Sequence, residues 1–181
     1  MNGANGIRTP FGGAARLAPD KVKNQEHERY MAFALREAEK AFREDEVPVG
    51  ACLVLKGEVV ARGHNRRERK NQVISHAEIE VLQKAARRLG SWRLPDAVLY
   101  VTLEPCLMCA GAILQARIQT VVFGTRDPKG GVAGSVIDVF STKLFNHRTE
   151  IIEGIYREGC SQILQKYFTM KRQRGEVAES G

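Results

Sequence analysis

Four side chains that can do chemistry lie in two short stretches, HAEIE (76–80) and PCLMC (105–109). His76, Cys106 and Cys109 are ligands of the types that zinc prefers. Structural zinc sites usually have a fourth protein ligand, whereas catalytic sites leave that position to a water molecule. Glu78 adds a carboxylate that can carry the protons of such a water. Together the four residues predict an open, catalytic zinc site.

The two cysteines taken alone leave several interpretations open. Cys106 and Cys109 are three positions apart on a predicted helix, so they share one face. Such a pair can be a redox dithiol, half of a structural zinc site, or a coincidence. A redox dithiol is expected in a thioredoxin-like βαβ unit, after its first strand, and this pair follows a later strand. The remaining candidate ligands lack ligand-like spacing, which favours an open site: Cys52, Cys160, His27, His64 and His147.

Glu78 also has a purely structural interpretation. Ser75 and Glu78 have the spacing of a capping box, in which Ser75 would be the N-cap of a helix. Within a regular helix, residues two apart do not face the same way. His76 and Glu78 can therefore reach one site only if His76 lies at the very start of the helix. Glu78 cannot close the cap and serve the site at once.

The elements that must position these residues follow from the pattern of apolar residues. Helical spacing is found at 26–44, 75–89 and 105–117, around 138–143, and from 157 to the basic stretch 171–174. Alternating or continuous apolar runs predict strands at 49–55, 59–61, 97–103, 119–125 and 150–155. Residues 65–74 and 126–136 are expected to be loops. This order predicts an α/β fold of three layers, α-β-α, with one mixed sheet of about five strands.

Length and composition suit one domain with a substantial core, because the chain has 181 residues of which 43% are hydrophobic. Residues 1–24 are expected to be a flexible extension, 25–174 the domain, and 175–181 a disordered tail. No apolar run reaches the length of a membrane span. The four cysteines do not suggest a disulfide scaffold in a chain this long, which indicates a reducing compartment such as the cytoplasm.

The formal net charge of +7 favours an anionic partner, and nucleic acid is the first candidate. Basic residues gather in two places, at 66–70 and along the last predicted helix from Lys166 to Arg174. A simpler interpretation is that these are solvated faces that keep the protein in solution.

Several longer motifs resemble the bacterial tRNA-specific adenosine deaminases of the TadA type, within the cytidine deaminase superfamily. They are VPVGACLV, GHNRRE, HAEIE, LYVTLEPCLMCAGAI, VVFGTRDPKGGVAGS and FNHRTEI, and the similarity runs from about His27 to Arg174. The H-A-E and P-C-x-x-C motifs alone indicate only the superfamily. The resemblance implies a cytidine deaminase-like fold and one Zn²⁺ per subunit on His76, Cys106 and Cys109. It also implies Glu78 as the general acid and base in hydrolytic deamination of adenosine to inosine at the first anticodon position of tRNA.

The resemblance further implies residues that contact the substrate. Asn65 would hydrogen-bond the target base, since an amide offers both a donor and an acceptor, although a turn Asn is the simpler interpretation. Val47 and Val49 would form an apolar wall, and Asp127 would approach the ribose 2′-OH. The remaining expected contacts with the RNA loop are Asn146, His147, Arg148 and an aromatic residue of the last helix, Tyr167 or Phe168.

The resemblance also implies a homodimer and the anticodon stem-loop of a tRNA as the partner. One stretch departs from the family pattern, because NQVI (71–74) replaces the usual Asp-Pro and small polar residue before H-A-E. We expect this change to affect the loop beside the pocket rather than metal binding.

Two rival functions share parts of this pattern. A deaminase of a free base or nucleoside, of the guanine or cytidine type, would have the same four residues without needing the basic segments. A non-catalytic RNA-binding subunit with a structural zinc would need no proton carrier, so Glu78 argues against it.

Overall fold

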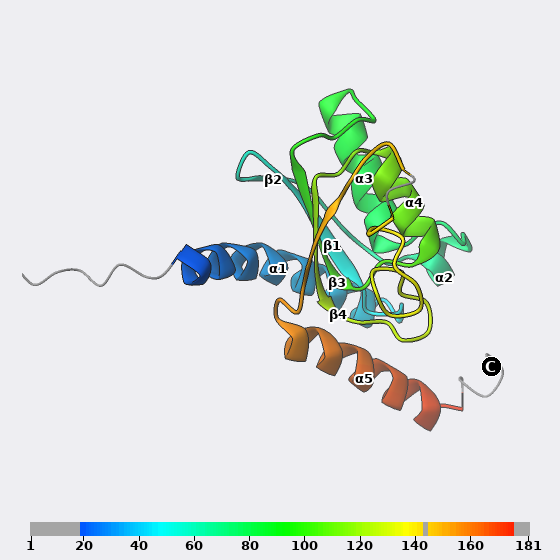
Figure 1. Cartoon of the computed structure of the whole chain (residues 1–181). Coiled ribbons are helices and arrows are strands. Elements are labelled where there is room, and N and C mark those ends of the chain that lie inside the picture. The colour runs from blue at the N-terminus through cyan, green and yellow to red at the C-terminus, as the bar shows by residue number, and fades with distance from the viewer. Residues whose placement is uncertain (1–18, 143–144, 176–181) are drawn as a thin grey trace, which may run out of the picture.

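The computed structural model describes residues 19–142 and 145–175 (Figure 1). Its strands are β1 (Gly50–Leu55), β2 (Glu58–His64), β3 (Ala97–Leu103), β4 (Thr120–Thr125) and β5 (Glu150–Glu153). Its helices are α1 (Pro19–Arg43), α2 (Arg67–Lys70), α3 (Ala77–Leu89), α4 (Leu107–Gln115) and α5 (Arg157–Gln173). All five strands form one sheet in the order β2-β1-β3-β4-β5.

The sheet is mixed, as predicted. β1 pairs antiparallel with β2 and β3, and β3, β4 and β5 then run parallel to one another. Parallel neighbours need a crossover connection, and α4 supplies the one between β3 and β4. Consequently β3 and β4 deliver their carboxyl ends to the same edge of the sheet, where the loops after Leu103 and Thr125 meet.

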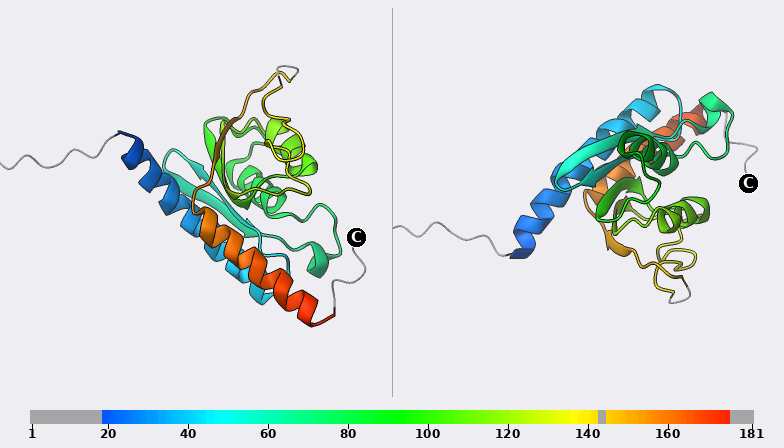
Figure 2. Two further views of the ribbon diagram at one scale, coloured as in Figure 1. Left: turned by 60° about the horizontal axis from the view of Figure 1, so that its bottom comes forward. Right: turned by 90° about the horizontal axis from the view of Figure 1, so that it is seen from above.

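Helices cover both faces of the sheet, which confirms the three-layer α/β fold (Figure 2). Successive residues of β1 point to opposite faces, as the period of a strand requires. Ala51 and Leu53 pack in the core that contains α3 and α4 residues. Cys52 and Val54 pack in a second core with residues of α1 and α5. The sheet therefore holds α3 and α4, which carry the HAEIE and PCLMC stretches, together on one face.

Two glycines allow the helices α1 and α5 to approach the sheet closely. A Cβ atom at Gly50 would lie 2.1 Å from the backbone oxygen of Ala34 in α1. A Cβ atom at Gly124 would lie 2.3 Å from the sulfur of Cys160 in α5. Cys160 is fully buried at this contact, so it is a core residue and does not belong to a metal site.

Three local predictions differ from the structure. No helix forms over residues 138–142, the described part of the predicted segment 138–143. There, Val139 instead donates its backbone N–H to Val132, and Asp138 forms a bridge with Ala133. The short helix α2 lies within the predicted loop 65–74. α1 begins at Pro19, inside the predicted extension, while residues 1–18 and 176–181 lie outside the described part.

Among the described residues, no helix is both long enough and apolar enough to span a membrane. All four cysteines of the chain are free thiols.

Candidate active site

His76 stands at the start of α3, where the backbone is not yet helical. It is the N-cap residue, with φ −74° and ψ 155°, so its side chain leaves the helix in a different direction from a helical neighbour. This confirms the condition under which His76 and Glu78 can share a site. The capping-box interpretation is wrong, because Ser75 precedes the N-cap and its hydroxyl donates to the side chain of Gln72 instead.

The two cysteines occupy the corresponding position on α4. Cys106 is the N-cap residue, with extended backbone angles, and Cys109 lies in the first turn. The predicted range began the helix at Pro105, but Pro105 precedes the helix in the structure. The positive end of the helix dipole favours thiolates at this position. The hydrogen bond with the Cys109 thiol, followed by the contact with His76, lowers the pKa of Cys106 to about 4.

His76, Cys106 and Cys109 have the geometry of a metal-ligand set. The Nδ1 atom of His76 lies 3.7 Å from the sulfur of Cys106 and 3.6 Å from that of Cys109. Bond lengths of about 2.0 Å to nitrogen and about 2.3 Å to sulfur in a tetrahedral site require a separation of about 3.5 Å. The three donor atoms lie within 4.8 Å of one another. The set therefore fits a tetrahedral metal ion that keeps one position open.

The other candidate ligands have different partners. Cys52 donates its thiol to the backbone oxygen of Tyr30, and His27 contacts the hydroxyl of Tyr100. His64 lies between Glu37 and Glu44, and His147 contacts the backbone oxygen of Ile118. Within the described part of the chain, no fourth His, Cys, Asp or Glu joins the three-residue group.

Glu78 lies beside these ligands and is buried, with 3% of its surface exposed. Burial raises the pKa of Glu78 to about 7. A carboxyl group with a pKa near neutrality can both accept and release a proton at physiological pH, which is the requirement for a general acid and base. The geometry thus supports the chemical interpretation of Glu78 over the structural one.

A pocket opens directly onto this group. Asn65, Val47, Val49 and Asp127 all line it, and their contacts with a substrate stay predictions. The remaining lining residues are Arg67, His76, Ala77, Glu78, Leu103, Glu104 and Cys106. The pocket therefore combines apolar side chains with several polar ones and the candidate metal ligands, as small-molecule sites usually do.

Glu104 was missed at the sequence level, although it immediately precedes the P-C motif. It is buried and fastens the loop that carries Asp127. Its carboxyl oxygens accept hydrogen bonds from the backbone N–H groups of Asp127, Ala133 and Ser135 at 2.8 to 3.1 Å, and from the Ser135 hydroxyl. Gly131 allows this approach, because a Cβ there would lie 2.4 Å from the Glu104 carboxyl group.

Three predicted RNA contacts lie outside the pocket. Asn146 accepts a hydrogen bond from Arg117, and Arg148 is exposed on the same segment before β5. Phe168 is 40% exposed on α5, where its ring packs edge-on against that of Tyr167. Their roles stay predictions about a larger ligand that extends beyond the pocket.

Comparisons with known proteins show which family this chain is similar to. Residues 25–172 match the family model described as MafB19-like deaminase. The tRNA-specific adenosine deaminase of Bacillus subtilis (strain 168) is 46% identical over 151 residues, which cover 83% of this chain and 94% of that protein. The enzyme of the same name from Agrobacterium fabrum is 46% identical over 147 residues, covering 81% of this chain and 97% of the relative.

Similar folds are found among solved structures. One of these structures comes from biochemical and structural studies of A-to-I editing by tRNA:A34 deaminases at the wobble position of transfer RNA. It is 47% identical, with a TM-score of 0.73, and covers 75% of this chain and 99% of its own. A guanine deaminase from Nitrosomonas europaea has a TM-score of 0.70 at 20% identity, covering 90% of this chain and 100% of its own, which shows the shared fold alone.

The fold, the three-ligand group and the buried glutamate define a deaminase of the cytidine deaminase type. Within that class, the chain belongs to the family of tRNA-specific adenosine deaminases.

Proposed function

We propose that this protein hydrolyses the adenosine at the wobble position of a tRNA to inosine and ammonia, using one zinc ion held by His76, Cys106 and Cys109. The observation that carries the proposal is the convergence of these three ligands with a buried glutamate in one pocket. The high identity to enzymes named for this activity favours tRNA adenosine over a free base.

Glu78 moves the protons. Zinc, when bound, supplies Lewis acidity that makes water a nucleophile at neutral pH. A carboxyl oxygen of Glu78 accepts the proton of the attacking water and donates it to the ring nitrogen next to C6. Glu78 then accepts the remaining proton of that water, from the oxygen now bonded to C6, and donates it to the amino nitrogen, which leaves as ammonia. The raised pKa of Glu78 suits both transfers, since the group must accept and release within one turnover.

The pocket walls orient the base. Val47, Val49 and Leu103 provide apolar surface for the faces of a purine, and the Asn65 amide provides a donor and an acceptor for its edge. Asp127 lines the pocket on the loop fastened by Glu104, and it would accept a hydrogen bond from a ribose hydroxyl. We expect the target nucleotide to be turned out of its stack and to enter the pocket while it remains part of a chain.

The rest of the anticodon stem-loop would lie across the basic surfaces next to the pocket. α2 contributes Arg67, Arg69 and Lys70, all exposed, and phosphate contacts are the main source of nucleic-acid affinity. Asn146, Arg148 and Phe168 are the proposed contacts farther from the base. A homodimer in the cytoplasm fits the family resemblance and the free thiols.

Incubation with an anticodon stem-loop that carries adenosine at the wobble position, and separately with free adenosine, cytidine and guanine, tests this proposal. We expect inosine in the stem-loop and no turnover of the free compounds. Turnover of only the free compounds would contradict the tRNA assignment, and turnover of none by zinc-containing protein would contradict the enzyme assignment.

A further inference from the structure

A second buried glutamate, Glu46, lies behind the pocket wall in the segment between α1 and β1. None of its surface is exposed. Burying a carboxyl group is costly unless hydrogen bonds compensate for the lost water. Glu46 is not a pocket-lining residue and has no part in the chemistry described above, so its burial needs another explanation.

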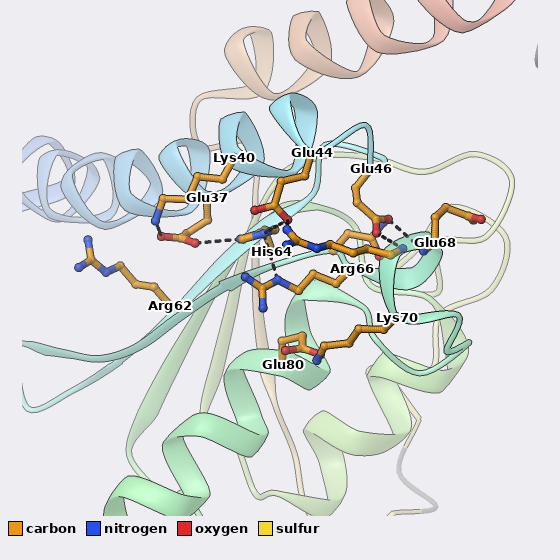
Figure 3. Close-up of polar contacts among 12 residues, drawn as sticks. Glu37, Lys40, Glu44, Glu46, Arg62, His64, Arg66, Glu68, Lys70 and Glu80 are labelled. Atoms are coloured by element: carbon orange, nitrogen blue, oxygen red, sulfur yellow. Dashed lines mark hydrogen bonds and ion pairs between the residues drawn. The ribbon is translucent and has the colours of Figure 1, made fainter.

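The carboxyl group of Glu46 accepts three hydrogen bonds from the chain that follows β2. Its Oε2 atom accepts from the Asn65 amide at 3.1 Å and from the Glu68 backbone N–H at 3.2 Å. Its Oε1 atom accepts from the backbone N–H of Arg69 at 2.7 Å. Figure 3 shows Glu46 extending toward Glu68 on α2. One side chain therefore fastens both Asn65 and the short helix next to it.

This contact determines how Asn65 presents its amide. The carboxyl oxygen that it faces already acts as an acceptor, so the end of the amide turned toward Glu46 is the NH₂ end. The oxygen end and the second N–H are then left for the pocket, in a fixed order. The backbone of Asn65 is held as well, because its N–H donates to the oxygen of Val49. A free amide would flip between two orientations of opposite polarity.

We propose that Glu46 is a positioning residue for recognition of the target base, and that it acts by holding the Asn65 amide in one orientation. This inference rests on the proposed function, in which Asn65 contacts the base. The same carboxyl group holds α2. Glu46 therefore determines both the orientation of the Asn65 amide and the position of the basic helix.

The test measures binding of two stem-loops, one with adenosine and one with an abasic nucleotide at the wobble position. All proteins carry Glu78→Ala, so that the substrate is not converted during the measurement. With Glu46→Gln, we expect affinity for the adenosine stem-loop to fall about tenfold, as expected for loss of the hydrogen bond between the Asn65 amide and the base. Affinity for the abasic stem-loop should change much less. A merely structural role would weaken both equally.

A double variant shows whether the effect passes through Asn65. In an Asn65→Ala background, Glu46→Gln should cause no further loss of discrimination between the two stem-loops. Glu37→Gln is the matched control, because Glu37 is also a buried glutamate and its recorded partners are His64 and Lys40. Glu37→Gln should leave the difference in affinity between the two stem-loops unchanged. If Glu46→Gln does not fold, Glu46→Asp takes its place, since the shorter side chain cannot reach both Asn65 and α2.

Equal losses on both stem-loops, or a loss of discrimination that persists in the Asn65→Ala background, would overturn the proposal. Failure of the proposed function itself would look different, because then the protein without Glu78→Ala would form no inosine in the adenosine stem-loop.

Discussion

At the scale of single residues, the site depends on two helix starts that have the same design. His76 and Cys106 are both N-cap residues with extended backbone angles, and each helix then supplies a second functional residue, Glu78 or Cys109. The change from extended to helical backbone lets residues two or three positions apart converge on one point. A regular helix would separate His76 from Glu78.

Glu78→Gln should abolish most inosine formation while zinc content and fold are retained. Glutamine has the same shape but cannot accept the proton of water, and positioned proton transfer contributes about 10²- to 10⁴-fold to rate. Single-turnover rates on the stem-loop, with zinc measured by mass spectrometry, check this. A variant that lost its zinc together with its activity would show that Glu78 is structural.

Cys109→Ala should lose the metal, because only two of the described ligands would remain. We also expect lower thermal stability, because a metal ion that binds only the folded protein stabilises it and this stabilisation would be lost. Cys109 is also fully buried, so its truncation removes core contacts. Metal analysis and thermal unfolding, with and without a chelator, measure both effects. Cys160→Ala is the control, since Cys160 lies in the core and should leave the metal content unchanged. Equal metal content in both variants would contradict the ligand assignment.

At the scale of elements, α1 is attached to the β1–β2 hairpin by close packing and by a buried polar cluster. Glu37 accepts hydrogen bonds from Lys40 at 2.6 Å and contacts His64 at 3.1 Å, and His64 also contacts Glu44 (Figure 3). Burial alone would raise the pKa of Glu37, but the hydrogen bonds with His64 and Lys40 outweigh it and lower the pKa to about 2.

This pKa makes stability depend on pH in a defined window. The unfolded chain binds a proton at Glu37 near its ordinary pKa of 4.5, whereas the folded protein does so only near 2. Glu37 therefore contributes stability above about pH 4.5, and this contribution is lost as the pH falls toward 2. We expect Glu37→Gln to lower the free energy of unfolding at pH 7 by about 2 kcal/mol. Denaturant unfolding from pH 7 to pH 3 should show a shallower pH dependence in the variant, and an unchanged slope would contradict this account.

Gly50→Ala tests the close approach of α1 to the sheet. A methyl group there would meet backbone atoms of α1, which cannot move aside as a flexible side chain can. We expect a loss of about 3 kcal/mol or more in the free energy of unfolding. Urea unfolding measures it, and a loss below about 1 kcal/mol would show that α1 can shift at little cost.

The core elements were predictable because their apolar residues repeat with the period of a helix or strand, as in β3 and α3. α2 was missed because it has only four residues, all charged, and none is buried. Its backbone is held by Glu46, some twenty positions earlier, and such a contact leaves no periodic signal. Glu104 was missed for a similar reason, since its partners are backbone groups of a distant loop. The metal ligands were predictable because their residue types and spacing are restrictive in themselves.

At the scale of the whole molecule, the pocket lies at the edge of the sheet where β3 and β4 end, with the basic helix α2 at its side. Arg67 lines the pocket, is exposed, and forms an ion pair with its neighbour Glu68 at 2.9 Å. A substrate that reaches Glu78 therefore passes the Arg67 side chain. This arrangement suits a single nucleotide turned out of a folded RNA loop.

Arg67→Ala should weaken binding of the stem-loop and reduce its dependence on salt. Loss of one phosphate contact lowers the slope of log affinity against log salt by about one. Titrations at several salt concentrations, with the Glu78→Ala protein as the reference background, give that slope. The abasic stem-loop should show the same change, because the contact is with phosphate rather than with the base. An unchanged slope would remove Arg67 from the proposed RNA surface.

The most direct test is position-resolved detection of inosine in total tRNA incubated with the purified, zinc-containing protein. We predict conversion at the wobble adenosine of those tRNAs that carry one, and no conversion when the protein carries Glu78→Ala. Absence of inosine with zinc-containing wild-type protein, or conversion by the Glu78→Ala variant, would contradict the account.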